Sequence, residues 1–214
     1  MRIAVVDCGS GNLRSVVRVV EHAAADEGIA AQVEVTTRPE DVLAADRIIM
    51  PGQGAFAACL NGLNSAAGLR EALETAVHRQ ARPFFGICVG MQLMADVSTE
   101  HGVYPGLGWV PGKVMALTPS DSSFKVPHMG WNELQLAEPV HPVLANLPAN
   151  PHVYFVHSYH LVCDRPEDCL AVTDYGGPVT AAVGRDNMVG TQFHPEKSQA
   201  VGLLLLRQFL QWNP

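Results

Sequence analysis

Residues 84–94 read FFGICVGMQLM, an apolar run in which two glycines bracket Cys88. The run predicts a buried strand over 83–87 and a helix over 89–96. Its G-x-C-x-G spacing matches the nucleophile elbow G-x-S-x-G, a sharp strand-to-helix turn where a flanking Cβ would collide with the backbone. Such a turn presents Cys88 beside the positive end of the helix, which favours the reactive thiolate. A buried structural cysteine is the alternative interpretation.

Strands and helices alternate outward from this turn through the first half of the chain. The other expected strands cover residues 2–7, 32–37 and 47–52. The expected helices cover Leu13–Glu27, ended by Gly28, and a stretch from about Gly68 to Gln80. Alternation of this kind predicts an α/β fold with a mostly parallel sheet.

Beyond residue 100 the pattern changes to short β-like pieces separated by Gly and Pro, which predicts a β-rich second half. The "GRDN" stretch (184–187) predicts a hairpin turn, and Ser198 is placed to cap a closing helix. The length of 214 residues suits one domain spanning residues 1–214.

Composition excludes several classes of partner. There are 14 basic and 21 acidic residues, a net charge of −7, and no run of Lys and Arg. We therefore expect no binding to nucleic acid or to an anionic membrane. The apolar stretch 200–210 is too short to span a membrane, and the first strand begins at Met1 without a signal peptide, so we expect a cytoplasmic protein. Five cysteines without CxxC spacing disfavour disulfides and a structural zinc site.

A nucleophilic thiol needs a base and an orienting group, and "QFHPEKS" (192–198) supplies both. Pro195 favours an extended His194, and residues two apart on an extended segment share a face, so His194 and Glu196 can pair. A surface loop is the alternative. His157 and His160 lie three apart on one expected strand and would face opposite sides, which makes them poor partners for one thiol.

Two Gly-rich turns are candidates for binding through the backbone. "PGQG" (51–54) ends a strand next to the one that carries Cys88 and can offer N–H groups to an oxyanion, although it also suits an ordinary turn. "DCGSGN" (7–12) lacks the third glycine of a dinucleotide-binding fingerprint, because position 14 is Arg. A tight strand-to-helix connection is its simpler interpretation.

Taken together, "PGQGAF", "GICVGMQLM" and "GTQFHPEKS" resemble the class I glutamine amidotransferases, which hydrolyse glutamine to release ammonia. Within that family, "DCGSGNLRSV", "PHMGWNEL" and "YFVHSYHL" are most similar to the amidotransferase subunits of imidazole glycerol phosphate synthases, in histidine biosynthesis. The resemblance spans nearly the whole chain. It implies a three-layer, flavodoxin-like fold, L-glutamine as substrate, a TIM-barrel cyclase as partner in a heterodimer, and neither metal nor cofactor.

The resemblance also implies roles for individual residues. The catalytic triad would be Cys88, His194 and Glu196. The oxyanion hole would be formed by Gln53, Gly54 and Val89, with Gln53 in place of a small apolar residue. Glutamine would be held by Gly52, Gln92, Ser158 and Tyr159. The partner would contact Asn12, Trp131, Tyr154 and Lys197.

Three other functions fit parts of the same pattern. The chain could serve another synthase, such as anthranilate synthase, although its short length and "PHMGWN" favour histidine synthesis. It could be a non-catalytic docking module, which the presence of Cys88, His194 and Glu196 together disfavours. It could be a cysteine peptidase with a related elbow, which would cleave peptides and ignore glutamine.

Overall fold

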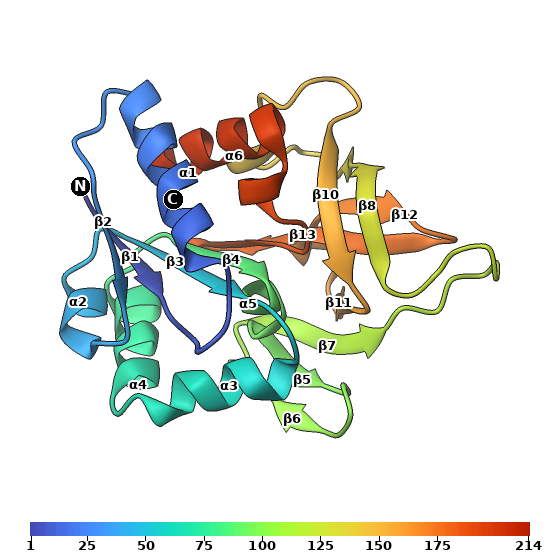
Figure 1. The fold of residues 1–214 in the computed structure, drawn as a ribbon, viewed down its shortest axis with the longest axis horizontal. Helices are drawn as coiled ribbons and strands as arrows, with labels where there is room; N and C mark the ends of the chain where they lie inside the picture. Colours follow the sequence, from blue (N-terminus) through green and yellow to red (C-terminus); the bar gives the residue numbers. More distant parts are fainter.

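The structure is a computed structural model that describes all residues, 1–214. Its centre is an eight-stranded sheet in the order β2-β1-β3-β4-β14-β13-β12-β9 (Figure 1). The strands are β1 (Arg2–Val6), β2 (Gln32–Thr36), β3 (Arg47–Gly52), β4 (Phe84–Cys88), β9 (Gln135–Leu136), β12 (Cys169–Asp174), β13 (Pro178–Arg185) and β14 (Met188–Thr191). The first five strands in this order, β2 to β14, pair with one another in parallel, whereas β13, β12 and β9 each pair antiparallel with the strand before them. This confirms the expected mostly parallel sheet.

Helices cover both faces of this sheet, so the fold has three layers (Figure 1). One face carries α1 (Leu13–Asp26) and α6 (Gln199–Gln211), and the other carries α3 (Phe56–Ser65) and α4 (Leu69–Glu74). The short helix α2 (Pro39–Leu43) packs on α4, which continues into the π-helical turn η1 (Thr75–Arg79). Because both faces are covered, β3 and β4 are buried along their whole length, as is typical of parallel strands.

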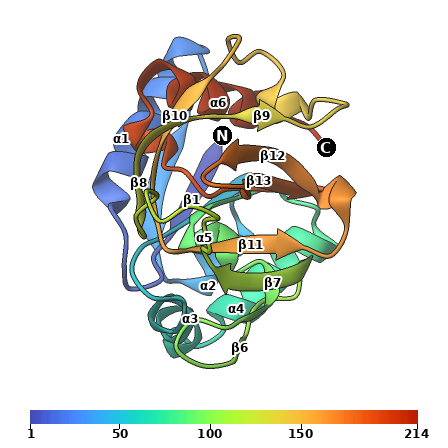
Figure 2. The same ribbon diagram turned by 90° about the vertical axis from the view of Figure 1, so that its right-hand side faces the viewer.

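The β-rich second half adds two smaller sheets beside the central one (Figure 2). One has the order β11-β7-β5-β6, and the other pairs β10 with β8. Their strands are β5 (Ala95–Ser98), β6 (Tyr104–Pro105), β7 (Val110–Ala116), β8 (His128–Glu133), β10 (His152–His157) and β11 (Tyr159–Cys163). Short 3₁₀ turns complete this half: η2 (Pro142–Leu144), η3 (Pro166–Asp168) and η4 (Pro195–Lys197).

One predicted helix was too long and one helix was missed. The helix after Cys88, α5 (Val89–Gln92), has four residues rather than eight, because the next backbone groups pair with a returning segment. The N–H groups of Leu107 and Trp109 donate to the carbonyls of Leu93 and Met94, at 2.8 and 2.9 Å. Helix α3 was not predicted, although its buried residues do follow a helical period: Phe56, Cys59, Leu60 and Leu63.

The turn that joins β13 to β14 is the hairpin expected at 184–187. Arg185 pairs with Met188, which leaves Asp186 and Asn187 as the two turn residues, and Asp186 has a φ of 52°. The Asn187 side chain donates to the carbonyls of Val77 and Arg82, at 2.9 and 2.7 Å. The turn is therefore fixed against the segment that leads into β4.

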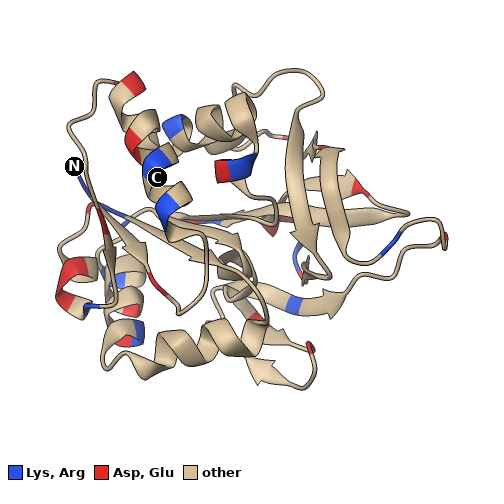
Figure 3. Cartoon of the chain, viewed as in Figure 1, with Lys and Arg blue, Asp and Glu red and all other residues tan.

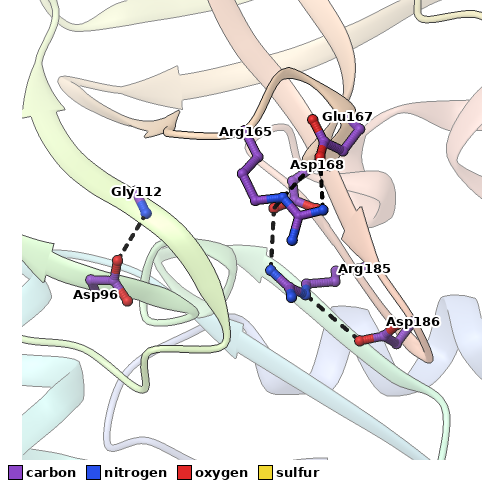
Figure 4. Close-up of polar contacts among 7 residues, drawn as sticks. All are labelled: Asp96, Gly112, Arg165, Glu167, Asp168, Arg185 and Asp186. Carbon is purple, nitrogen blue, oxygen red and sulfur yellow. Dashed lines mark hydrogen bonds and ion pairs between the residues drawn. The ribbon is translucent and has the colours of Figure 1, made fainter.

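Charged residues form local pairs rather than a patch. Figure 3 shows Lys and Arg interspersed with Asp and Glu over both halves of the chain. Near η3, the buried Asp168 carboxylate lies 3.9 Å from Arg165 and 3.6 Å from Arg185 (Figure 4). Elsewhere in the same view, Asp96 accepts a hydrogen bond from the Gly112 N–H at 3.1 Å. None of the helices has the length and apolar character that crossing a membrane requires.

The turn after Cys88 is wedged against β3, and glycines make this approach possible. A Cβ on Gly90 would lie 1.8 Å from the Met50 carbonyl oxygen, and one on Gly86 would lie 2.8 Å from the Gly90 oxygen. On the β3 side, a Cβ on Gly52 would meet the Gly90 nitrogen at 2.8 Å. All of these contacts are with backbone atoms, which a side-chain rearrangement cannot relieve.

We expect Gly90→Ala to destabilise the protein by roughly 3 kcal/mol or more, because the added methyl overlaps a backbone carbonyl at 1.8 Å. Gly28→Ala is the control: Gly28 has a φ of +64° with open space around it, so only conformational strain of about 1–2 kcal/mol is expected. Urea unfolding midpoints of both variants make the comparison. Equal stability of the two would show that β3 and the elbow are not held at this distance.

Candidate active site

Cys88 ends β4 and enters α5 through a strained turn. Its φ of 55° and ψ of −111° lie outside the regions that non-glycine residues ordinarily occupy. Strain of this kind persists only where the surrounding packing enforces it, and it is concentrated at functional sites. The residue is 5% exposed. Because α5 has only four residues, the helix contributes less to stabilising a thiolate than the expected eight-residue helix would.

The His194 side chain is held by Glu196. Its Nδ1 lies 2.8 Å from Glu196 Oε1, and the two side chains are 3% and 2% exposed. His194 itself is extended, but residues 195–197 form the 3₁₀ turn η4 rather than an extended segment. The expected pairing therefore occurs, but through a tight turn and not through the alternation of a strand.

Ser198 occupies the N-cap position of α6, as predicted, but its side chain makes no capping hydrogen bond and anchors the His194 backbone instead. Its hydroxyl donates to the His194 carbonyl at 2.7 Å and accepts from the Tyr154 N–H at 3.0 Å. The His194 N–H donates to the Tyr154 carbonyl at 3.0 Å. The backbone of His194 is thus tied to β10 at two points, while its ring is fixed by Glu196.

The electrostatic environment keeps His194 protonated. Burial lowers its pKa, but favourable interactions with Cys88 and Glu196 outweigh this effect and raise the pKa to about 9. The Cys88 sulfur also accepts from Gln192 Nε2 at 3.5 Å. At neutral pH His194 is therefore a proton donor.

A cavity of about 280 Å³ opens over Cys88 and His194. Eight of its twelve lining residues are predicted site residues: Gln53, Gly54, Cys88, Val89, Gln92, Ser158, Tyr159 and His194. The other four were not anticipated: Glu100, Pro127, Val156 and His157. Two of the residues predicted to act in catalysis or glutamine binding are absent from the lining, since Gly52 lies against Gly90 beneath the turn and Glu196 stands behind His194.

The "PGQG" turn is held from outside the cavity. Gln53 follows β3, and its carbonyl accepts from the Ser10 hydroxyl at 2.8 Å and from the Cys59 thiol at 3.3 Å. Gly54 has a φ of 79°, in the region that favours glycine. The carbonyl of residue 53 is therefore occupied, and the peptides around Gly54 lie at the cavity wall beside Val89.

Gln92, Ser158 and Tyr159 form the opposite wall. Gln92 Nε2 donates to the Tyr159 carbonyl at 2.9 Å and to Gln192 Oε1 at 3.0 Å. The Ser158 carbonyl accepts from the Leu117 N–H at 2.8 Å. Ser158 separates β10 from β11, so the single strand expected to carry His157 and His160 was wrong.

Glu100 is the residue of clearest chemical interest that sequence reasoning missed. It lies on the loop after β5, lines the cavity, and accepts from the Phe56 N–H at 2.6 Å. A carboxylate there is a suitable partner for an ammonium group. A loop glutamate has no sequence signal that distinguishes it from a surface charge, so only the fold places it in the site.

Three of the four residues expected at a partner interface gather on one surface. Trp131 is 47% exposed, and its ring centroid lies 6.0 Å from that of Tyr154, its register partner across β8 and β10. Lys197 Nζ lies 5.9 Å from the centre of the same Tyr154 ring. Asn12, also exposed, precedes α1, which packs on η4. Trp131 is thus a surface residue and not part of the core.

Comparisons with known proteins agree with this geometry. Residues 4–211 match the family model described as glutamine amidotransferase class-I. The proteins named imidazole glycerol phosphate synthase subunit HisH from Rhodospirillum rubrum and from Rhizobium meliloti are each 54% identical to this chain, over the full length of both proteins.

Solved structures show the same fold at much lower identity. One described as a glutamine amidotransferase has a TM-score of 0.71 at 18% identity and covers 97% of each chain. A second, described as a glutamine amidotransferase from Thermotoga maritima, has a TM-score of 0.68 at 14% identity, covering 99% of this chain and 96% of that one. The expected amidotransferase fold is confirmed, and the chain belongs to the class I glutamine amidotransferase family.

Proposed function

We propose that this chain hydrolyses L-glutamine to glutamate and ammonia, as the amidotransferase subunit of an imidazole glycerol phosphate synthase in histidine biosynthesis. The observation that carries the proposal is that His194, held by the buried Glu196 at 2.8 Å, lines the same cavity as Cys88. Relatives that are 51–54% identical along their full length bear the name of that subunit. We treat residues 1–214 as one catalytic domain, since 54 buried apolar residues form one continuous core.

In the proposed mechanism the Cys88 thiolate attacks the side-chain amide carbon of glutamine. The carbonyl oxygen becomes an oxyanion, which backbone N–H groups of the Gly54 and Val89 region stabilise. His194 gives its proton to the nitrogen, and ammonia leaves a glutamyl thioester on Cys88. His194, now neutral, takes a proton from water, whose oxygen attacks the thioester. Glutamate is released, and the thiolate and imidazolium are restored.

The cavity also offers groups for the amino-acid end of glutamine. The Glu100 carboxylate suits its ammonium group, and the backbone at Ser158 and Tyr159 offers partners for its carboxylate. In this proposal Gln92 acts by bracing the Tyr159 carbonyl, because its amide nitrogen already donates to that oxygen and to Gln192.

Ammonia requires a protected route, because in neutral water it becomes ammonium, which is not a nucleophile. We propose that a TIM-barrel cyclase docks on the surface formed by Trp131, Tyr154 and Lys197 and receives the ammonia there. The exposed indole of Trp131 is the kind of side chain that anchors an interface. Product formation would follow in the cyclase, giving imidazole glycerol phosphate and aminoimidazole carboxamide ribotide.

We place this activity in the cytoplasm. All five cysteines are unpaired, and free thiols persist in compartments kept reducing by the glutathione and thioredoxin systems. An active-site thiol has the same requirement, since oxidation would remove the nucleophile.

Cys88→Ala should abolish glutamine hydrolysis while synthesis from added ammonium salts by the complex with the cyclase continues, because only nitrogen release requires the thiol. The measurement follows glutamate and imidazole glycerol phosphate separately, with each nitrogen source. Glutamine turnover by the pure Cys88→Ala complex would contradict the assignment of the nucleophile.

His194→Ala should lower kcat for glutamine hydrolysis on the order of a thousandfold, and Glu196→Gln should lower it less, since an orienting group is partly replaceable. In the unaltered complex kcat/KM for glutamine should fall as the pH rises through about 9, where His194 of the free enzyme loses the proton that departing ammonia needs. Without the Glu196 carboxylate the His194 pKa is lower, so Glu196→Gln should move this fall to lower pH. If Glu196→Gln leaves the pH profile unchanged, the pairing of His194 with Glu196 is not what sets the pH at which activity falls.

Lys197→Ala should impair coupling between glutamine hydrolysis and product formation, because the substitution removes the ammonium group that lies over the Tyr154 ring on the proposed docking surface. The ratio of glutamate to imidazole glycerol phosphate should rise, or the Kd for the cyclase should increase. Lys113→Ala, on β7, is the control. If neither quantity differs between the two variants, Lys197 is only a surface charge.

A further inference from the structure

Two buried histidines beside the cavity take no part in the proposed mechanism. His157, at the end of β10, lines the cavity, and His128, at the start of β8, packs behind it. His157 Nε2 lies 3.1 Å from His128 Nδ1, and His157 Nδ1 lies 2.9 Å from the Tyr159 carbonyl oxygen. The His157 and His128 side chains are 6% and 3% exposed, so water cannot readily replace a hydrogen-bond partner that either ring loses.

The cavity end of this contact chain fixes where the protons are. A carbonyl oxygen only accepts, so His157 Nδ1 must carry a hydrogen and donate it to Tyr159. In a neutral ring the other nitrogen is then a bare acceptor, so the hydrogen between the two rings belongs to His128 Nδ1. His128 Nε2 is left as an acceptor.

The Asn132 end of the chain independently requires His128 Nε2 to be an acceptor. Asn132 Oδ1 accepts from the Glu133 N–H at 2.8 Å, and Asn132 Nδ2 donates to the Asp174 carbonyl at 2.9 Å. The amide orientation is therefore fixed, and its NH₂ group faces His128 Nε2 at 3.4 Å. Every hydrogen bond from Asn132 to Tyr159 consequently runs in one direction.

The surroundings keep both rings neutral and in place. The His128 ring stacks between Phe155 and Tyr175, with centroids 4.6 and 3.9 Å away. Burial lowers the pKa of His128 to about 4 and that of His157 to about 3. The titratable groups that act on His157 are the histidines at 128, 160 and 194, all of which oppose a second positive charge.

We propose that His157 is a positioning residue for glutamine binding: with His128 and Asn132 it forms a one-directional hydrogen-bond chain that fixes the Tyr159 carbonyl at the wall of the active-site cavity. That oxygen has a second donor in Gln92 Nε2, and the Ser158 carbonyl is held by Leu117. The peptides that would face the substrate are thereby immobilised before it arrives. This role rests on the proposed glutaminase function.

The same chain connects the cavity wall to the exposed surface of β8. Asn132 follows Trp131, which is 47% exposed, and Met129 on the same strand is 61% exposed. A shift of β8 would change the geometry at Asn132 and His128, and then at His157. Contact on this outer surface thus has a direct physical route to the glutamine-binding backbone.

The proton positions are testable without any activity. Nitrogen-15 NMR of the protein labelled at histidine, at neutral pH, should show His157 and His128 both neutral with the hydrogen on Nδ1. Signals are assigned by His157→Phe and His128→Phe. An Nε2–H form or an imidazolium at either residue would overturn the chain as described.

The positioning role is testable by kinetics in the complex with the cyclase. His157→Phe keeps the volume but removes both hydrogen bonds, and it should raise KM for glutamine about five- to tenfold with kcat changed less than twofold. His157→Asn can place an N–H where Nδ1 was, so it should restore most of the loss. His152→Phe, the same change at the exposed start of β10, is the control and should match the unaltered protein.

A double-mutant cycle separates a chain from two independent packing effects. His128→Phe alone should raise KM about two- to threefold by weakening the contact to His157, and should add nothing in the His157→Phe background. Additive effects, an unchanged KM in His157→Phe, or no rescue by His157→Asn would overturn the positioning role. Failure of the unaltered complex to hydrolyse glutamine would instead refute the proposed function. The NMR result would still decide whether the hydrogen-bond chain has the proposed proton positions.

Discussion

The backbone contact between the Cys88 turn and β3 is the constraint on which the rest of the site depends. Gly90 lies so close to the Met50 carbonyl that no side chain fits between them, and Gly52 meets the same turn from the β3 side. This approach forces Cys88 into its unusual φ of 55° and sets Cys88 beside the peptides that follow β3. Nucleophile and candidate oxyanion donors are therefore positioned by one packing interaction, before any substrate binds.

The His194–Glu196 pair shows how the fold maintains charges in a buried place. Desolvation alone would leave the imidazole neutral, yet partners on both sides raise its pKa to about 9. A buried pair tolerates this only when the geometry is firmly held. Ser198 and Tyr154 supply that restraint by binding the His194 backbone. The short turn η4 thus brings Glu196 back to His194, and this pairing fixes the position of the His194 ring and keeps it protonated.

The cavity joins the two halves of the chain. Its catalytic wall comes from turns at the carboxyl ends of β3 and β4, where parallel sheets commonly place their ligands. Its opposite wall comes from the break between β10 and β11 in the β-rich half. The histidine chain from Asn132 to Tyr159 belongs to this second wall and reaches the exposed surface of β8. The elbow and the histidine chain thus lie on opposite walls of one cavity.

The sequence by itself predicted the parallel sheet, the elbow at Cys88 and the partnership of His194 with Glu196, because the alternation of strands and helices, the G-x-C-x-G spacing and the two-residue separation can each be read along the chain. Short-range patterns could not reveal that α5 stops at Gln92, since its continuation is replaced by pairing with residues 107–110. Glu100 and His157 were missed for the same reason, as each becomes part of the site only through neighbours distant in sequence. Tertiary structure alone decided which side chains share the cavity, because burial and hydrogen-bond partners there arise from contacts between segments that local periodicity does not connect.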